Sequence, residues 1–302
     1  MRFRPNLARA LAVVTAASAA AVVLAACGSS SSSSSASTAT VPKPNTLALT
    51  ISDTGKTSVY AGPTTTAGGL LQVQLTNKGK APHGAQLVLI LGKHSPAQAL
   101  RQIGNPSGKT PGWLRAVGGV GYANPGETAT ATDNVPAGKY LVFDVAALSS
   151  GGPGSGPPAH SALTVTPGTA GPLPATTASV TAATAGKDKY KWNISGLKAG
   201  ANRITFNSKG SNALHILTVV RLKGHPTNAQ IEKGLSSNSS APPSFVDTNA
   251  PTPQTAALDG GKSQTTTLNL PPGRYVFFCP LHDRDGGKPH FLEGLLKQVV
   301  IH

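Results

Sequence analysis

The sequence is poor in the residues on which most enzyme chemistry depends. Its 302 residues include two cysteines, one methionine and 11 acidic residues, and aromatic residues make up 5% of the chain. No Gly-x-Ser-x-Gly or His-Glu-x-x-His motif occurs, and few carboxylates are available for acid–base chemistry. No hydrophobic run is long enough to be a convincing membrane span. These absences argue against the common serine and zinc hydrolases, and we expect a protein that is not an enzyme.

The first 26 residues are expected to be a secretory signal. Arg2, Arg4 and Arg9 precede an apolar, alanine-rich run, which is typical of exported proteins. The run ends in Leu24-Ala25-Ala26-Cys27. This segment resembles the lipobox of bacterial lipoproteins, in which the cysteine is lipidated and becomes the new N-terminus. An ordinary cleavage site with an incidental cysteine is the alternative.

A serine-rich segment, residues 27–45, follows the signal and is expected to be a disordered tether. A chain lipidated at Cys27 would be anchored on the outer face of a bacterial cell membrane. Cys279 would then be an unpaired thiol in an oxidising compartment, where a free cysteine needs a reason to persist.

The chain carries more basic than acidic residues. The formal net charge is +15, and removal of the signal takes three arginines and no acid, which leaves +12. Near a membrane this charge favours anionic lipid or a cell-wall polymer as a partner. Nucleic acid is not expected, because the chain lacks a cluster of basic and aromatic residues. The basic residues are scattered, so a solvated surface is the alternative for most of them.

Two similar halves follow the tether, and we expect them to be domains at 46–167 and 175–302. Residues 124–140 parallel residues 259–275. The turn residues that match are Gly126/Gly261, Asn134/Asn269, Pro136/Pro271, Gly138/Gly273 and Tyr140/Tyr275. Each half also has a capping box for one short helix, at Ser95 and at Thr227. A match of this length indicates two copies of one domain rather than a solenoid.

The composition predicts an all-β fold. The 34 glycines and 25 prolines favour turns, and short segments with alternating apolar residues favour strands. Examples are residues 70–76 in the first half and residues 201–206 and 265–270 in the second. Short strands at this spacing, with one brief helix in each half, predict two tandem Greek-key β-sandwiches.

A candidate metal site lies near the C-terminus. Cys279 ends a predicted strand, His282 and His290 follow it, and His215 lies just before another predicted strand. A thiolate and imidazoles from neighbouring strand ends are what a small copper site on a β-sandwich needs. A buried cysteine in a core position, with histidines on the surface, is the alternative.

The second half resembles the cupredoxins, the plastocyanin-like family of single-copper β-sandwiches. The segments that carry the resemblance are Asn212-Ala213-Leu214-His215, then Pro272-Gly273-x-Tyr275-x-Phe277-x-Cys279, then Gly294-Leu295 before the last apolar strand. The resemblance covers roughly residues 176–302. It implies one copper, held by His215, Cys279 and a second histidine, and single-electron transfer or copper handling as the function.

Spacing favours His290 over His282 as the second histidine. His282 lies three residues after the cysteine, as in plastocyanins, whereas His290 lies five residues before Leu295. Relatives with a longer loop keep this histidine close to the axial position, so His290 is preferred and His282 stays the alternative. Leu295 departs from the family pattern, because it stands where methionine is usual. Leucine cannot ligate, so the resemblance implies an axially open copper site with a raised reduction potential.

The first half lacks this ligand set. In the repeat, Asp144 stands at the position of Cys279, and His83 and His160 have no thiolate partner. We therefore expect the first domain to be a degenerate copy without a metal. Two functions remain open: a membrane-anchored copper protein that serves a redox or copper-donor protein partner, and a metal-free β-sandwich lipoprotein that acts in binding or adhesion.

Overall fold

A computed structural model of the chain describes residues 42–55, 57–103, 109–146, 158–237, 239 and 241–302. The expected signal, Cys27 and the expected tether up to residue 41 lie outside these residues. Among the described helices, none has the length and apolar character needed to cross a bilayer.

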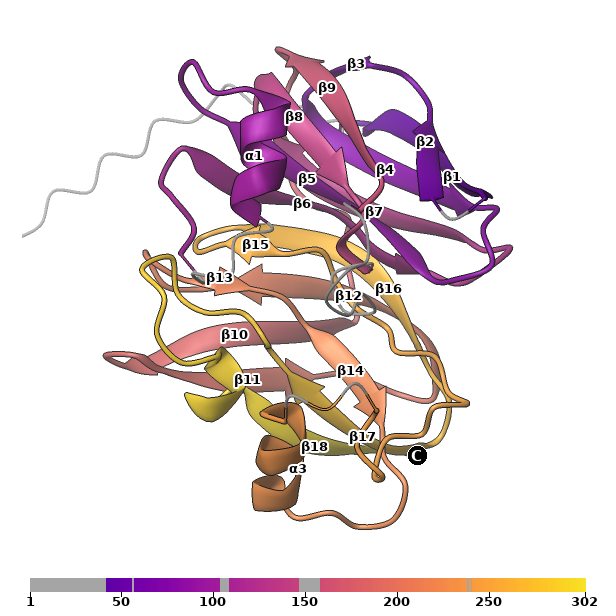
Figure 1. The fold of residues 1–302 in the computed structure, drawn as a ribbon, viewed down its shortest axis with the longest axis vertical. Coiled ribbons are helices and arrows are strands. Elements are labelled where there is room, and N and C mark those ends of the chain that lie inside the picture. The colour runs from indigo at the N-terminus through magenta and orange to yellow at the C-terminus, as the bar shows by residue number, and fades with distance from the viewer. Residues whose placement is uncertain (1–41, 56, 104–108, 147–157, 238, 240) are drawn as a thin grey trace, which may run out of the picture. The chain divides into compact units, whose positions relative to one another are not determined.

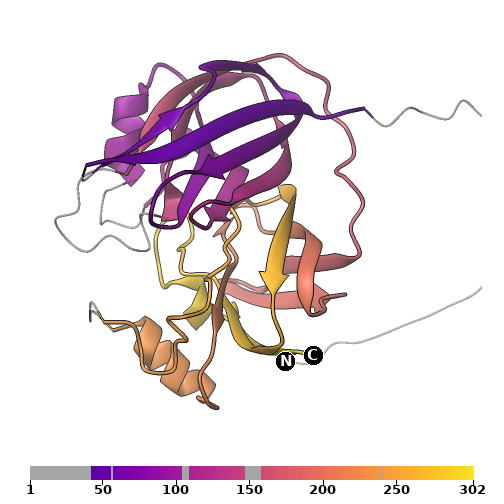
Figure 2. The ribbon, with the colours of Figure 1, turned by 90° about the vertical axis from the view of Figure 1, so that its right-hand side faces the viewer.

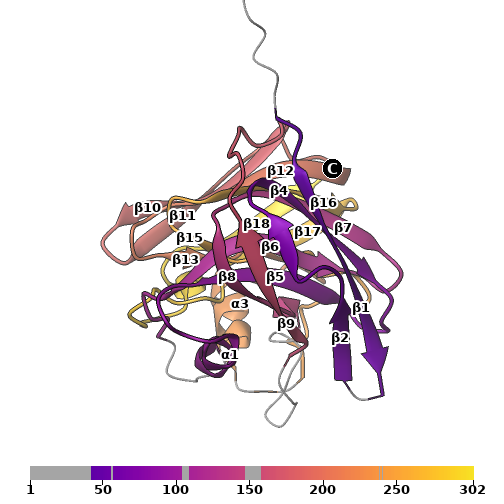
Figure 3. The same cartoon turned by 90° about the horizontal axis from the view of Figure 1, so that it is seen from above.

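The first half is a β-sandwich. One layer has the strand order β2-β1-β4-β7 and the other has the order β6-β5-β8-β9-β3 (Figures 1 and 3). The strands are β1 Asn45–Thr54, β2 Thr57–Ala61, β3 Thr65–Ala67, β4 Gly69–Asn77, β5 His83–Ile90, β6 Leu114–Ala123, β7 Thr128–Val135, β8 Gly138–Phe143 and β9 His160–Thr166. Alternation along β4 turns Leu71, Val73 and Leu75 inward, where they share a core with Leu87 and Tyr140 of the other layer.

The second half is also a β-sandwich. Strands β11-β10-β12-β16 form one layer, and β14-β17-β18 face them. The strands are β10 Ala178–Gly186, β11 Lys189–Ser195, β12 Gly200–Ser208, β13 Leu214–His215, β14 Thr218–Arg221, β15 Leu258–Asp259, β16 Ser263–Leu270, β17 Gly273–Phe278 and β18 Leu296–Ile301. Phe206 of β12 and Phe277 of β17 are fully buried in the common core. The fold is therefore all-β, with two tandem sandwiches, as the sequence predicts.

Each sandwich carries one short α-helix. Helix α1 spans Pro96–Ile103 and α3 spans Asn228–Leu235 (Figure 2). Both predicted capping boxes are confirmed: the side chains of Ser95 and Thr227 accept from the backbone of Gln98 and Gln230, whose side chains accept in return. A 3₁₀ turn, η1 His290–Leu292, precedes β18.

The two sandwiches share hydrogen-bonded sheets. Strand β16 pairs with β7, so the β11-β10-β12-β16 layer and the β2-β1-β4-β7 layer join into one eight-stranded sheet. Strand β15 pairs with β6 and attaches β13 to the sheet of the first half. The described residues from 42 to 302 consequently form a single compact unit. The expected division at residues 167–175 lies in a segment without helix or strand between β9 and β10, and it stays a prediction.

Candidate metal centre

Strand β17 delivers Cys279 to the interior of the second sandwich. Because side chains alternate along a strand, Tyr275, Phe277 and Cys279 all face the main core. Val276 and Phe278 face the opposite way, toward a separate cluster that includes Ile231 of α3. Cys279 is fully buried and is a free cysteine.

Two other segments bring histidines to the same place. His215 lies on β13, where it pairs with Leu258 of β15. His290 opens η1, and its backbone N–H donates to the carbonyl of Leu281 at 2.8 Å. The η1 turn is also bonded to the cysteine, because the backbone N–H of Phe291 donates to the Cys279 carbonyl at 2.9 Å. Both histidine side chains are fully buried.

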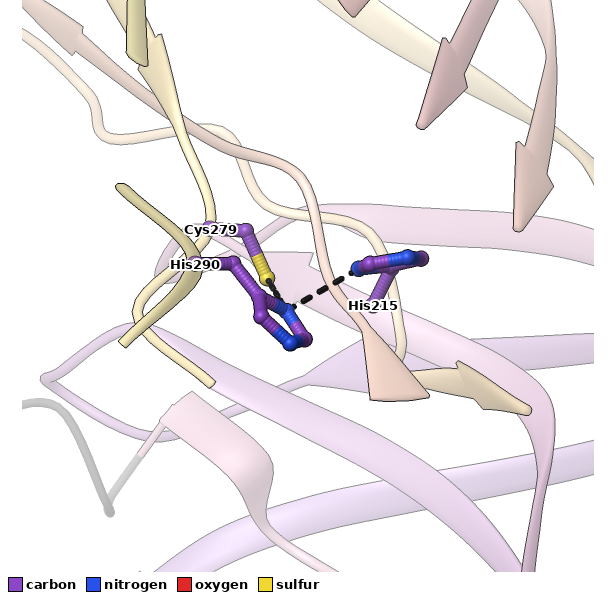
Figure 4. Close-up of side chains that lie close together, drawn as sticks. All are labelled: His215, Cys279 and His290. Atoms are coloured by element: carbon purple, nitrogen blue, oxygen red, sulfur yellow. Dashed lines mark hydrogen bonds between the residues drawn. The ribbon is translucent and has the colours of Figure 1, made fainter. Parts of the chain in front are cut away.

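The three side chains point toward one another (Figure 4). Nδ1 of His290 lies 3.0 Å from Nδ1 of His215 and 3.5 Å from Sγ of Cys279. All three ligand atoms lie within 4.8 Å of one another. The sulfur also accepts a hydrogen bond from the backbone N–H of Ile216 at 3.4 Å. The structure thus brings together His215, Cys279 and His290, the three residues preferred from the sequence.

The outer nitrogen of each ring is held by an oxygen. Nε2 of His215 lies 3.1 Å from the carbonyl oxygen of Lys209, and Nε2 of His290 lies 3.2 Å from Oδ1 of Asp283. A carbonyl oxygen can only accept, so Nε2 of His215 carries its proton. Oδ1 of Asp283 also accepts from the Tyr190 hydroxyl at 2.7 Å, which favours the same tautomer for His290.

This arrangement leaves both Nδ1 lone pairs directed at each other across 3.0 Å, which is unfavourable unless a proton or a cation lies between them. A proton is costly there, because burial lowers the pKa of His215 to about 3 and that of His290 to about 4. Burial likewise raises the pKa of the Cys279 thiol to about 12. A soft cation would satisfy both lone pairs and the sulfur at once, so the donor set fits a bound metal.

The alternative histidine lies apart from this cluster. His282 is partly exposed, and its Nδ1 contacts the carbonyl of Gly287 at 2.8 Å inside the loop between Cys279 and His290. It belongs to none of the groups of metal-ligating atoms found among the described residues. Leu295 is fully buried, and its backbone bonds both to Cys279 and to His290.

A second group of possible ligands shares His290. Asp283, His290 and Glu293 also bring their ligand atoms within 4.8 Å, but both carboxylates are partly exposed. In this group His290 would use Nε2, the nitrogen that already contacts Asp283. A second carboxylate at such a position is common without any ion, so the fully buried group is the stronger candidate.

In the first half, Asp144, the residue that the sequence repeat aligns with Cys279, forms a buried pair with a histidine. Nδ1 of His83 lies 2.6 Å from Oδ2 of Asp144, and both side chains are buried. Nε2 of His83 lies 3.3 Å from Asp53. The hydrogen bond to Asp144 raises the pKa of His83, which favours the protonated imidazole beside this carboxylate. His160 is exposed and contacts the carbonyl of Pro158.

Sequence reasoning missed Tyr190 and Asp283. The Tyr190 ring packs against both histidines, with centroid distances of 4.8 Å to His215 and 4.7 Å to His290. Its hydroxyl orients Asp283, which in turn holds His290. Tyr190 reads in the sequence as an ordinary strand residue, and nothing in its spacing links it to a loop that begins about ninety positions later.

Comparison with known proteins adds little beyond fold. No family model matches the sequence, and no curated protein does either. Auracyanin B is 24% identical over 43% of this chain and 91% of its own, with a TM-score of 0.28. Auracyanin A, a blue copper protein from Chloroflexus aurantiacus, is 22% identical over 40% of this chain and 99% of its own, also with a TM-score of 0.28. A multicopper oxidase is 18% identical over 85% of this chain and 88% of its own, with a TM-score of 0.24.

These identities lie below 25% and these TM-scores below 0.5. Such likenesses concern the fold alone and do not indicate what this chain binds. The case for a metal centre therefore rests on the geometry of His215, Cys279 and His290.

Proposed function

We propose that the protein is a cupredoxin-like copper protein that holds one copper in its second sandwich for single-electron transfer or copper handling. The observation that carries this proposal is the convergence of one thiol sulfur and two imidazole Nδ1 atoms within 4.8 Å, at three fully buried residues. Buried polar atoms normally have a hydrogen-bond partner, whereas here two imidazole nitrogens face each other at 3.0 Å.

Copper suits the donor set better than zinc. Structural zinc sites have four protein ligands, and catalytic zinc sites have three ligands and an open position for water. Here the described cluster offers three ligands at fully buried residues, and the fully buried leucine expected at the axial position offers neither a fourth ligand nor access for bulk water. A trigonal His₂Cys set with a weak or missing axial ligand is the arrangement typical of blue-copper centres.

The surrounding residues would prepare the site for a metal that changes oxidation state. Copper would supply one-electron redox chemistry. Cys279 would bind as the thiolate, and the Ile216 N–H would stabilise its negative charge. Lys209 and Asp283 fix the two rings with Nδ1 inward, so little side-chain rearrangement is needed for binding. Leu295 would leave the axial position open, which would raise the reduction potential relative to a methionine site.

The first sandwich is proposed to be a metal-free copy of the second. Two observations support this. Tyr140 and Tyr275 each donate to a carbonyl four residues earlier, at 2.7 Å, in matching turns. The Asp144 carboxylate occupies the sequence position that corresponds to Cys279 and binds His83 instead of a metal.

We also propose that the chain is exported and anchored to a membrane through a lipidated Cys27, with a redox or copper-donor protein as its partner. The lipobox-like segment and the serine-rich segment that follows support anchoring. The net positive charge would favour anionic lipid or cell-wall polymer nearby.

Metal loading of the purified full chain tests the proposal. Metal-free protein with one equivalent of Cu(II) should develop a strong thiolate-to-copper absorption in the visible range and retain the copper through dialysis. Cys279→Ser should lose the absorption. Protein that retains no copper, or that holds zinc far more tightly than copper without a coloured copper form, would contradict a copper role. If the protein retains no copper, a metal-free binding or adhesion module is the better description.

A further inference from the structure

Arg284 attaches the loop between Cys279 and His290 to the first sandwich. The side chain of Arg284 is 7% exposed, which is low for an arginine. Its backbone oxygen accepts from the N–H of Thr110 at 2.8 Å, and its Nη1 donates to the carbonyl of Pro111 at 3.2 Å. Its backbone N–H donates to the carbonyl of Asn212 in the second half at 3.1 Å.

The same guanidinium forms an ion pair with Asp259, a buried carboxylate of β15. A buried arginine is expensive to desolvate unless it is paired and its remaining donors are bonded. Here Nη2 is paired with the Asp259 carboxylate, and Nη1 donates to the carbonyls of Thr110 and Pro111. The pair is therefore a fixed part of the interior rather than a flexible surface contact.

Asp259 connects this loop to the other histidine. Leu214 and His215 of β13 pair with Asp259 and Leu258 of β15. Strand β15 continues onto the first half, where Leu258 pairs with Val117 of β6 and the Asp259 carboxylate accepts from a backbone N–H of that strand. Both histidine-bearing segments are thus bonded to the first sandwich, whereas Cys279 follows β17, which pairs only within the second.

We propose that the first sandwich is a clamp for the metal centre, with Arg284 and Asp259 as the positioning residues that fix the two histidine segments relative to Cys279. The inference rests on the proposed function of the site and assigns a role to the sandwich that has no thiolate site of its own. Loss of the clamp loosens the loop that carries His290, so it weakens metal binding and alters the metal geometry while the two cores stay folded.

The decisive comparison is between two arginines that share Asp259. Arg284→Gln removes the buried partner that belongs to the loop. Arg115→Gln removes a half-exposed partner, 3.8 Å from the other carboxylate oxygen, that belongs to β6 rather than to the loop. Because residues that orient metal ligands commonly contribute 10- to 100-fold to metal affinity, Arg284→Gln should weaken copper binding by about that factor. Arg115→Gln should leave it within a small factor of wild type, and Arg284→Lys should restore part of the loss.

A readout without metal separates the clamp from the proposed function. In metal-free full-length protein, amide hydrogen exchange across residues 280–291 and 212–216 should be faster in Arg284→Gln than in wild type or Arg115→Gln. Exchange in β4 and β12, inside the two cores, should be unchanged. If Arg284→Gln does not fold, Arg284→Lys and Asp259→Asn provide the same comparison with smaller changes.

The outcomes distinguish the two hypotheses. Unchanged exchange in the loop, together with unchanged copper affinity and spectrum, overturns the clamp and leaves the copper site standing. Wild-type protein that binds no copper overturns the proposed function and with it the role of the clamp in metal binding, even if exchange in the loop accelerates. Faster exchange with weaker and spectrally altered copper binding, specific to Arg284 and Asp259, supports both.

Discussion

At the scale of single residues, the tautomers of the two histidines decide the chemistry of the site. Each ring has its outer nitrogen bonded to an oxygen, so each inner nitrogen is free to act as a ligand. The partners are unequal, because His215 contacts a backbone carbonyl and His290 contacts a carboxylate. A carboxylate makes an imidazole more basic, so His290 is expected to be the stronger donor of the two.

His290 rather than His282 should therefore control copper binding. His290→Gln should abolish the visible absorption of the copper-loaded protein or reduce copper affinity by at least about 100-fold, since one of three ligands is lost. His282→Gln is the matched control, because it changes the same residue type in the same loop at a partly exposed position. Equal loss in both variants, measured by absorption and by copper titration, would show that the ligand assignment is wrong.

Leu295 should set the reduction potential. Leu295→Met exchanges side chains of similar volume, so the cost in stability should be below about 1.5 kcal/mol at this buried position. A thioether at the axial position should lower the potential, because it stabilises the oxidised copper. Potentiometric titration of both copper-loaded proteins measures the difference. An unchanged or higher potential would indicate that this side chain is not axial to the metal.

At the scale of elements, the contact between β7 and β16 contains a fully buried carboxyl group. Asp133 of β7 is fully buried opposite Gln264 of β16. It accepts from the N–H of Gly119 at 3.0 Å and from the Gln264 amide at 3.2 and 3.3 Å. Burial nevertheless raises its pKa to about 8, so the group is held mainly in its neutral form at pH 7.

Asp133→Asn should consequently stabilise the protein at neutral pH. A carboxyl group whose pKa is higher in the folded state favours folding most below its unfolded value of 3.8, and this contribution is lost as the pH rises toward about 8. Asparagine does not titrate, so the free energy of unfolding of the variant should exceed that of wild type by roughly 1 to 3 kcal/mol at pH 7. The gain should shrink as the pH falls toward 4.

Denaturant titrations across this pH range test the prediction. Asp188→Asn, at an exposed position, should leave the pH dependence as in wild type. A destabilised Asp133→Asn variant at pH 7 would mean that the folded protein needs the ionised carboxylate at this contact.

The sequence predicts elements better than it predicts their partners. Alternation in Tyr275-x-Phe277-x-Cys279 places the cysteine on the core face, and the capping boxes at Ser95 and Thr227 define the helix starts. These signals are local, so a single sequence contains them. The pairing of β7 with β16 and the contact between Tyr190 and Asp283 depend on segments far apart along the chain, and no local pattern encodes such contacts.

At the candidate metal centre, the sequence predicts three residues that the structure brings together, and it misses the residues around them. The spacing between His290 and Leu295 favours the histidine that the structure places beside Cys279. The attachment of the loop by Arg284 was not predictable, because an arginine in a glycine-rich polar loop is normally a solvated residue. Its burial depends on Thr110, Pro111 and Asp259, which belong to two segments outside the loop.

At the scale of the whole molecule, the two sandwiches share a hydrophobic core as well as hydrogen-bonded sheets. The main core of the second half includes Leu114 and Phe143 from the first half. Gln86 of β5 exchanges two hydrogen bonds with the backbone of Ala257, at 2.6 and 3.0 Å. Separation of the halves would expose this apolar surface and leave these buried polar groups without partners.

The two halves should therefore unfold in one transition. The chain has two tryptophans, Trp113 in the first half and Trp192 in the second, which can report on each half separately. Fluorescence of Trp113→Phe and of Trp192→Phe should give coincident denaturation midpoints, in agreement with calorimetry. Two separated midpoints would instead indicate domains that fold independently.

The continuous eight-stranded sheet also determines how the molecule behaves among its own copies. A strand at the edge of a sheet can recruit another chain through its unpaired backbone groups. Pairing of β7 with β16 removes one such edge from each sandwich and leaves β2 and β11 at the ends of the sheet. Strand β2 has only five residues, and β11 carries exposed lysines at positions 189 and 191. Pairing of β7 with β16 thus removes two edges, and the short length of β2 and the like charge of β11 oppose edge-to-edge aggregation at the two ends of the sheet.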